Sequence, residues 1–229
     1  MEVIPHVYHL TIRGVNIILI AEEELTLVDT GFRGSSPKII SFIRSLGRSV
    51  KEISLIILTH NHLDHVGGLP ELKKLTPAKV AAHKADISDV ESQLPYSRFA
   101  LRLMHIPLFT SLRPFVYAKP SDIDIWLEGG EELKPLGGLK VIHTPGHTLG
   151  SISLFSPQKK LLMVGDAINN WHKTLRLPPK MVSTNLRQAV DSVKGLAQLD
   201  FDILCFGHGR PLTTNARAKV QDLVAKAKD

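Results

Sequence analysis

One short stretch of the chain concentrates residues that can bind a metal ion. Its sequence is Thr59-His60-Asn61-His62-Leu63-Asp64-His65-Val66-Gly67-Gly68. Neutral imidazole nitrogens and carboxylate oxygens are ligands for zinc and other first-row divalent metals. His60 and His62 alternate along an extended segment and can point the same way, while Asp64 and His65 follow one loop step later. A lone loop histidine is usually solvated, but this density favours a metal site with two ligands for each of two ions.

The segment before this stretch predicts the element that positions it. Residues 53–58 form an apolar run rich in β-branched side chains, which is typical of a buried strand. Gly67 and Gly68 end the cluster and free the chain to turn. The four side chains are therefore expected on a tight loop at the carboxyl end of a strand, where open α/β sheets place their ligand sites.

The rest of the chain alternates strand and helix patterns, so we expect an α/β fold. Strands are predicted at residues 7–13, 16–21, 25–29, 53–58, 79–83, 139–143, 152–155, 161–164 and 203–206. Helices are predicted from Ser36 to Gly47 and at residues 69–75, 185–199 and around 220–227. In the first helix we expect Ser36 to be the cap, with Pro37 in the first turn.

Composition sets broad limits. A chain of 229 residues with 43% hydrophobic and 22% charged residues is ordinary for a globular protein, and we expect a single domain over residues 1–229. A net charge of +6 permits an anionic substrate without demanding one. The single cysteine, Cys205, lies in an apolar run, so we expect it in the core and the protein in a reducing cytoplasm. The N-terminus lacks a signal-peptide pattern, and no apolar run is long enough to span a bilayer.

Five motifs in order resemble those of the metallo-β-lactamase superfamily. His60-x-His62-x-Asp64-His65 resembles its signature. The other four are Val28-Asp29-Thr30-Gly31, Thr144-Pro145-Gly146-His147-Thr148, Val164-Gly165-Asp166 and Phe206-Gly207-His208-Gly209. They extend over most of the chain. The resemblance implies a four-layer αββα sandwich, and this pattern is specific for fold and metal site but not for substrate.

The resemblance also implies two divalent metal ions per chain. One would be held by His60, His62 and His147, and the other by Asp64, His65 and His208, with Asp166 and a water bridging the two. Zinc is expected for these ligands, with iron or manganese as alternatives. Asp29 would hydrogen-bond the histidine loop instead of binding metal, although a plain turn is the alternative role for Asp29. His62 stands where the superfamily's diiron electron-transfer proteins usually have glutamate, which favours hydrolysis.

The implied reaction is hydrolysis by a metal-bridging hydroxide, with Asp64 both binding metal and orienting the nucleophile as the catalytic residue. We expect a small ester, thioester or lactone as substrate, and promiscuity is compatible with such a site. A phosphodiesterase or nuclease of the same superfamily is the alternative. A non-catalytic metal-binding member is the second alternative. The expected partner is a small molecule, not nucleic acid or membrane, and a homodimer remains open.

A helical insertion between the two halves, at about residues 86–120, is not explained by the superfamily core. Its apolar residues fall at helical spacing, which suggests a lid over the metals, a dimer contact or both. Lactonases of the superfamily use a tyrosine near the metals, so Tyr96 and Tyr117 are candidates for the substrate pocket. His83 and His143 lie in predicted strands, and we expect structural roles for them.

Overall fold

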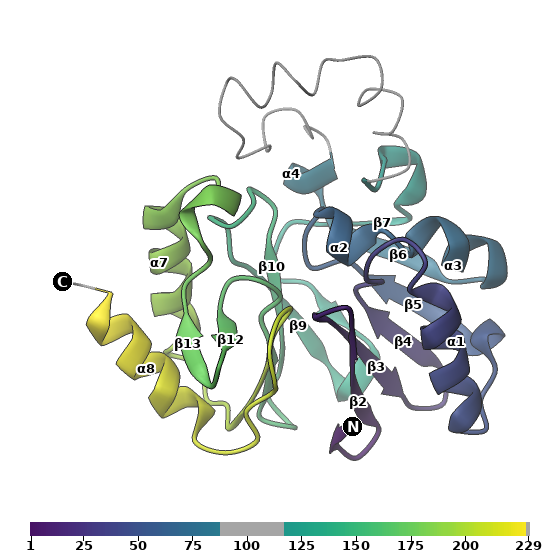
Figure 1. The fold of residues 1–229 in the computed structure, drawn as a ribbon, viewed down its shortest axis with the longest axis horizontal. Helices are drawn as coiled ribbons and strands as arrows, with labels where there is room; N and C mark the ends of the chain where they lie inside the picture. Colours follow the sequence, from purple (N-terminus) through teal and green to yellow (C-terminus); the bar gives the residue numbers. More distant parts are fainter. Residues whose placement is uncertain (88–116, 228–229) are drawn as a thin grey trace.

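The computed structural model describes residues 1–87 and 117–227. Two β-sheets face each other, and helices cover the outer face of each sheet (Figure 1). This arrangement is the expected αββα sandwich. The predicted helical insertion lies mainly in residues 88–116, outside the described residues, as does Tyr96.

Within the described residues, the first sheet has seven strands in the order of the chain. They are β1 (Glu2–Ile4), β2 (Val7–Ile12), β3 (Val15–Ala21), β4 (Leu25–Val28), β5 (Ile53–Ile57), β6 (Lys79–His83) and β7 (Ile125–Leu127). Strands β1 to β4 are antiparallel, whereas β4 to β7 are parallel. Parallel neighbours require crossovers, and helices α1 (Ser36–Ser45) and α3 (Leu69–Leu75) lie in two of them. The carboxyl ends of β4, β5 and β6 therefore meet at one edge.

The second sheet has five strands in the described chain. In spatial order they are β14 (Ile203–Cys205), β11 (Leu161–Met163), β10 (Ile152–Ser156), β9 (Leu139–His143) and β8 (Glu132–Leu133). Helix α7 (Leu186–Leu196) lies in the crossover between the parallel strands β11 and β14, and α8 (Ala216–Lys226) follows them. A separate hairpin, β12 (Asn169–Trp171) and β13 (Thr174–Arg176), stands at the edge of this half (Figure 1).

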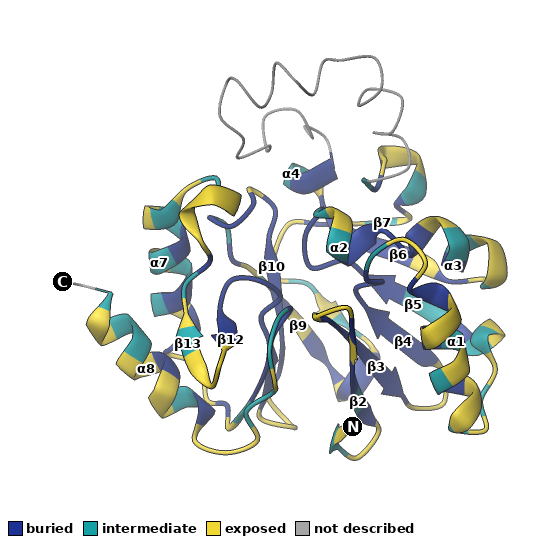
Figure 2. Cartoon of the chain, viewed as in Figure 1, coloured by how far each residue is buried: buried dark blue, intermediate teal, exposed yellow. Residues whose placement is uncertain are grey.

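Three apolar layers hold the four structural layers together. One lies between the first sheet and helices α1 and α3, and includes Ile39, Ile56 and Leu72. The second lies between the two sheets, and the third packs the second sheet against α7 and α8. Figure 2 shows the central strands of the first sheet buried and the helices buried on one side only, whereas β13 is exposed. Cys205 belongs to the middle layer and is fully buried, and burial raises the pKa of its thiol to about 12. The prediction of a core cysteine is confirmed.

The sequence-predicted elements agree with the structure to within a few residues, with one clear correction. The cap of α1 is Ser35, not Ser36, and neither side chain forms a capping hydrogen bond. Ser36 is instead buried and donates its hydroxyl to the Gly68 carbonyl at 3.3 Å, which ties α1 to the glycine pair after the histidine loop. The short strands β1, β7 and β8 and the hairpin were not predicted. Within the described residues, no helix combines the length and apolarity needed to cross a bilayer.

A core substitution should measure how far the site's supporting strand depends on packing. Ile56 lies in β5 and is fully buried. Replacing it with alanine, Ile56→Ala, should lower the free energy of unfolding by about 2–5 kcal/mol, because it removes buried methylenes and leaves a cavity. Urea denaturation measures this. The control Leu75→Ala, at a side chain that is 46% exposed, should change it by less than about 1 kcal/mol. Equal losses in the two variants would contradict this account of the core.

Candidate metal centre

The candidate ligands all lie just beyond the carboxyl ends of strands. His60 and His62 follow β5, and Asp64 and His65 lie in the short helix α2 (Leu63–Val66) that continues the loop. From the second sheet, His147 follows β9, Asp166 follows β11 and His208 follows β14. The two sheets thus present their loops to each other at one edge of the sandwich (Figure 1).

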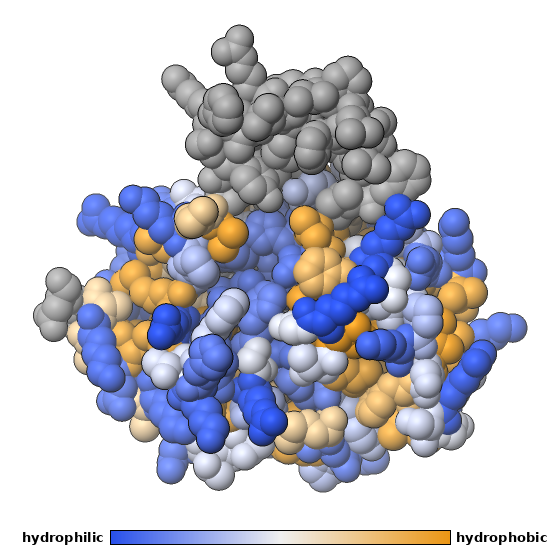
Figure 3. Space-filling view, in the orientation of Figure 1, coloured by the Kyte–Doolittle hydropathy of each residue, from blue (hydrophilic) through white to orange (hydrophobic). Residues whose placement is uncertain are grey.

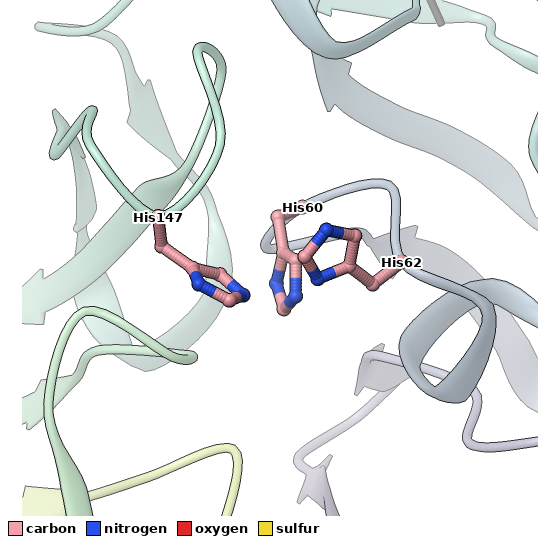
Figure 4. Close-up of side chains that lie close together, drawn as sticks. All are labelled: His60, His62 and His147. Atoms are coloured by element: carbon pink, nitrogen blue, oxygen red, sulfur yellow. The ribbon is translucent and has the colours of Figure 1, made fainter. Parts of the chain in front are cut away.

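Three groups of these side chains have their ligand atoms within 4.8 Å of one another. The groups are His60, His62 and His147; His60, His65 and Asp166; and Asp64, His65 and His208. Figure 4 shows the first group, in which the imidazoles of His60 and His62 from one loop face that of His147 from the opposite loop. The groups share members, so they form one continuous cluster.

The separations within the cluster are those of ligands around a shared ion. His208 Nε2 lies 3.3 Å from both Asp64 Oδ2 and Asp166 Oδ2. His65 Nε2 lies 3.6 Å from Asp64 Oδ2 and Asp166 Oδ1, and His147 Nε2 lies 3.6 Å from Asp166 Oδ2. Ligands about 2.0–2.2 Å from a tetrahedral zinc ion are roughly 3.3–3.6 Å apart. These distances are longer than most hydrogen bonds and match that spacing.

Hydrogen bonds on the far side of two imidazoles decide which nitrogen faces the cluster. Asp29 Oδ2 accepts from His65 Nδ1 at 2.8 Å. It also accepts from the Thr59 hydroxyl at 2.8 Å, so that hydroxyl must in turn accept from His60 Nδ1 at 3.0 Å. Both rings therefore carry a proton on Nδ1 and turn Nε2 inward.

The imidazoles from the second sheet are fixed in the same way. His208 Nδ1 donates to the Gly14 carbonyl at 3.0 Å. The Ser183 hydroxyl donates to the Pro179 carbonyl at 2.8 Å and faces His147 Nδ1 at 3.5 Å, where it can only accept. All four rings thus present Nε2 to the centre.

The inward atoms have no partner within the described chain. His60 Nε2, His65 Nε2, His147 Nε2 and Asp166 Oδ1 are buried and make no hydrogen bond to described residues. An unpaired buried polar atom costs about 1–3 kcal/mol, so several of them side by side call for something that satisfies them together. A divalent cation fits this donor set of imidazoles and carboxylates.

Two imidazoles are basic because carboxylates surround them. Burial alone lowers the pKa of His65, but the charges of Asp29, Asp166 and Asp64 outweigh it and raise that pKa to about 9. Burial also opposes protonation of His208, yet the carboxylates of Asp166 and Asp64, each 3.3 Å from its Nε2, raise its pKa to about 11. Without a cation, protons therefore occupy the inward nitrogens of these rings at neutral pH.

The other imidazoles are held neutral. Burial and the nearby His65 charge lower the pKa of His60, and burial lowers the pKa of His147. Burial is the main cause that lowers the pKa of His62 to about 3, because it and the neighbouring His147 imidazole disfavour a second charge there. A histidine that is neutral at physiological pH offers a lone pair to a metal without first losing a proton.

Asp29 hydrogen-bonds to the histidine loop. Its side chain is buried, and besides the two bonds of Oδ2 its Oδ1 accepts from the backbone N–H of Thr59 at 2.8 Å. Its backbone is left-handed, with a φ of 61°. One carboxylate thus orients His65 and binds the residue before His60. The left-handed backbone of Asp29, just after β4, is one that asparagine and aspartate adopt more readily than most residues.

Asn16 supports the His208 loop and was missed from the sequence. Its side-chain nitrogen donates to the carbonyls of Phe206 at 3.0 Å and Gly209 at 2.7 Å, and its backbone N–H donates to Gly207. Asn16 therefore fastens both sides of the loop to β3 of the other sheet. No local pattern distinguishes it from any other polar residue in a strand.

His83 and His143 have structural roles, as expected. Their rings stack with centroids 4.1 Å apart. His83 Nε2 bonds the Glu128 carbonyl at 3.2 Å and His143 Nε2 bonds the Leu149 carbonyl at 2.8 Å. Tyr117 is half-buried and precedes Ala118, whose backbone bonds the side chain of Asn61 in the histidine loop. That places its backbone near the centre, while its role in a substrate pocket stays a prediction.

Comparison with known proteins supports the geometry. The profile of the family described as "Metallo-beta-lactamase superfamily" matches residues 10–208. The chain is 32% identical to the uncharacterized protein YobT of Bacillus subtilis, covering 93% of this chain and 91% of that one. It is 27% identical to the probable metallo-hydrolase YflN of the same organism, over 97% of this chain and 91% of the relative.

A third relative is the hydroxyacylglutathione hydrolase GloC of Haemophilus influenzae. It is 27% identical over 64% of this chain and 62% of its own length. Among solved structures, a metallo-beta-lactamase family protein from Thermus thermophilus superposes with a TM-score of 0.74 at 24% identity, over 99% of this chain and 81% of that one. At that identity the likeness shows the shared fold.

The tight packing of the His208 loop yields a test of the centre. A Cβ on Gly207 would lie 2.0 Å from Asp166 Oδ1 and 2.8 Å from His65 Cε1. Gly207→Ala should therefore displace Asp166 or His65 and reduce the rise in melting temperature that added zinc produces, by half or more. Thermal denaturation with and without zinc measures this. The control Gly195→Ala meets nothing within 4 Å, so zinc should stabilise it as it does the wild type, while its helix gains up to about 1 kcal/mol. A full zinc response in Gly207→Ala would show that the centre is packed differently.

Proposed function

Because the chain belongs to the metallo-beta-lactamase superfamily, we propose that it is a dinuclear metal-dependent hydrolase of small esters, thioesters or lactones. The observation that carries the proposal is the cluster of inward-facing, unpartnered imidazole and carboxylate atoms at the edge where the two sheets meet. Superfamily members are metal-dependent hydrolases, and the relative YflN is described as a probable metallo-hydrolase. What we propose is the type of bond that is hydrolysed and the number of metal ions that the chain binds.

We assign His60, His62 and His147 to one ion, and Asp64, His65 and His208 to the other. The grouping of ligand atoms supports this division. Asp166 would serve both ions, since its Oδ1 lies near His65 and its Oδ2 near His147 and His208. Zinc suits this ligand set, and iron or manganese are the alternatives. Bound divalent ions would supply a polarised scissile bond and a nucleophilic water at neutral pH.

The exposure of the side chains defines the open edge of the centre. His65 and His147 are almost fully buried, Asp166 is 9% exposed, and His208 and Asp64 are 19% and 21% exposed. Reactants therefore reach the centre past Asp64 and His208. An exposed carboxylate at that edge is placed to orient the attacking water and take its proton, which is the role proposed for Asp64.

Apolar side chains around the centre support a hydrophobic substrate group. Leu63 separates His62 from Asp64, Leu149 follows the His147 motif, and Trp171 lies with its ring centroid 6.2 Å from that of His208. All three are exposed, as are Met181 and Val182 beside Ser183. In Figure 3, apolar side chains stand on both sides of the hollowed centre of this face. Such a rim suits an acyl or alkyl group better than a charged phosphodiester.

The phosphodiesterase alternative needs cationic side chains to bind the permanent negative charge of its substrate. Of the cations that the sequence offers for this purpose, Lys119, Lys173 and Arg176 are described and exposed, while Arg98, Arg102 and Arg113 lie in residues 88–116. The relative GloC is described as a hydroxyacylglutathione hydrolase, which supports a carbonyl substrate by analogy. A small-molecule partner is therefore proposed over nucleic acid.

Metal binding should release protons. His65 and His208 are protonated at pH 7, with pKa values of about 9 and about 11, and an ion can bind only after those protons leave. We expect two zinc ions per chain and the release of roughly two protons on binding near pH 7, with affinity rising as pH increases toward 9. Elemental analysis gives the stoichiometry, and calorimetry in buffers of different ionisation enthalpy gives the proton count. A chain that takes up no more than trace metal would refute the assignment.

Asp64 should matter for turnover more than for folding. Its side chain is partly exposed, so Asp64→Ala opens no core cavity and should leave the fold intact. We expect kcat to fall by about 100-fold to 10,000-fold, because a ligand and a proton acceptor are lost together, and the second metal site to weaken. Steady-state kinetics at saturating zinc checks this, with the exposed Asp222→Ala on α8 as control. Wild-type turnover in Asp64→Ala would remove the proposed role.

The substrate class is tested by a panel of aryl esters, thioesters, lactones and bis-aryl phosphodiesters under one metal condition. We expect the highest kcat/KM for a carbonyl substrate with a hydrophobic acyl group. Trp171→Ala should lower kcat/KM by roughly 10-fold for long acyl chains and little for acetyl esters, because it removes apolar contact area.

The chain provides a matched control in its other tryptophan. Trp126 on β7 is 45% exposed, close to the 50% of Trp171, and should be neutral when replaced by alanine. A phosphodiester preferred by 10-fold or more, about 1.4 kcal/mol of transition-state preference, would reverse the proposed ranking. Binding of metal without turnover of any substrate would favour the non-catalytic alternative.

A further inference from the structure

Asp86 is a buried carboxylate that the chemistry described so far does not use. It lies in the short helix α4 (Lys84–Ile87), directly after β6, and is only 2% exposed. The histidine motifs give no hint of it, since it stands 21 residues beyond His65 in the sequence. A charge buried this deeply is costly unless hydrogen-bond donors surround it, so its partners reveal its role.

One set of partners belongs to the histidine loop of the first sheet. Asp86 Oδ2 accepts from the backbone N–H of Asn61 at 2.9 Å, and its carbonyl accepts from the Asn61 side chain at 3.1 Å. The same Asn61 amide bonds both backbone groups of Ala118, at 3.2 Å to its carbonyl and 2.9 Å from its N–H. Asn61 stands between His60 and His62, so Asp86 hydrogen-bonds the loop between the two residues that carry the imidazoles.

The other set belongs to the loop that carries His147. Asp86 Oδ2 also accepts from the Thr148 hydroxyl at 2.8 Å, and its Oδ1 accepts from the Gly150 N–H at 2.5 Å. A Cβ on Gly150 would lie 2.5 Å from the Asp86 backbone nitrogen and 2.8 Å from Oδ1, so the glycine is what allows this close approach. Thr148 directly follows His147, so the hydrogen bond from Thr148 to Asp86 is also adjacent to a candidate ligand.

We propose that Asp86 is a positioning residue that sets the distance between the His60–His62 loop and His147, and so tunes the affinity of the three-histidine site. The inference rests on the proposed function, since it concerns the same metal centre. A single carboxylate bonds donors from two loops that belong to different sheets. Oδ2 alone accepts from both loops, and Oδ1 adds a second bond to the His147 loop, so a change at Oδ2 would remove the direct bridge between them. Nearby side chains that orient ligands typically change metal affinity by 10- to 100-fold.

The test compares Asp86→Asn in two single-site backgrounds. His208→Ala leaves the three-histidine site, and His147→Ala leaves the site formed by Asp64, His65 and His208. Asn at position 86 keeps the shape but turns an NH₂ group toward one of the donors, so a bond is replaced by a repulsion. Titration with Co²⁺ alone, followed by its d–d absorption, should show a 10- to 100-fold loss of affinity in the His208→Ala background. In the His147→Ala background the affinity should change by less than about 2-fold.

Asp124→Asn is the control for the same chemical change at an exposed carboxylate. Asp124 Oδ2 also accepts a backbone N–H, that of Val80 at 2.9 Å, but it bonds neither histidine loop. The Asp124→Asn variant should bind Co²⁺ with the same affinity as its parent in both backgrounds. Equal losses for Asp86→Asn in both backgrounds would overturn the inference, because Asp86 would then support the fold as a whole. Unchanged affinity in both would overturn it as well.

The outcomes separate this inference from the proposed function. A wild-type chain that binds no Co²⁺ defeats both. A wild-type chain that binds two ions and hydrolyses esters, with an indifferent Asp86→Asn, defeats the inference alone. If Asp86→Asn does not fold, Thr148→Val tests the same link between the loops, because it removes the hydroxyl that donates to Asp86. It should weaken only the three-histidine site, and Thr148→Ser, which keeps the hydroxyl, should restore it. Failure of that pattern overturns the inference.

Discussion

The centre depends on one constraint, which is that the Nε2 atoms of several imidazoles must face one another where the two sheets meet. Such an arrangement repels itself unless each ring is anchored from behind. Asp29, the Gly14 carbonyl and the hydroxyls of Thr59 and Ser183 provide those anchors, and each of them acts as an acceptor for an Nδ1 proton. The outer hydrogen bonds therefore determine the inner chemistry, because they leave only Nε2 available.

The anchors also explain why the centre needs both sheets. The Ile152 N–H bonds the Thr59 carbonyl at 2.9 Å, and Asn16 on β3 holds the loop of His208 from the other sheet. Asp86 spans the same boundary. Each loop is thus held by residues of the opposite half. A displaced sheet would separate the ligand groups even if every loop kept its own conformation.

The sequence was sufficient for what local patterns encode. The apolar run of β5 and the dense histidines after it predicted the loop, and the five motifs predicted which side chains would converge. The sequence was insufficient for residues whose roles depend on hydrogen-bond partners elsewhere in the chain. Asp86 and Asn16 look ordinary because their partners stand far away in sequence. The β12–β13 hairpin escaped prediction because its turn uses His172 and Lys173 at φ values of 51° and 65°, where glycine or asparagine is the usual signal. Strands of two or three residues carry too little pattern to detect.

The graded exposure of the ligands has a consequence for how metal would come and go. Two of the three ligands in the group Asp64, His65 and His208 are partly exposed, whereas only His62 is partly exposed in the three-histidine group. A chelator would therefore strip an ion held by Asp64 and His208 first, and the ion behind it more slowly. With the two ions that we propose, metal exchange would be an ordered process with two rates. During scarcity the chain would pass through a singly loaded form, in which the buried ion outlasts the accessible one.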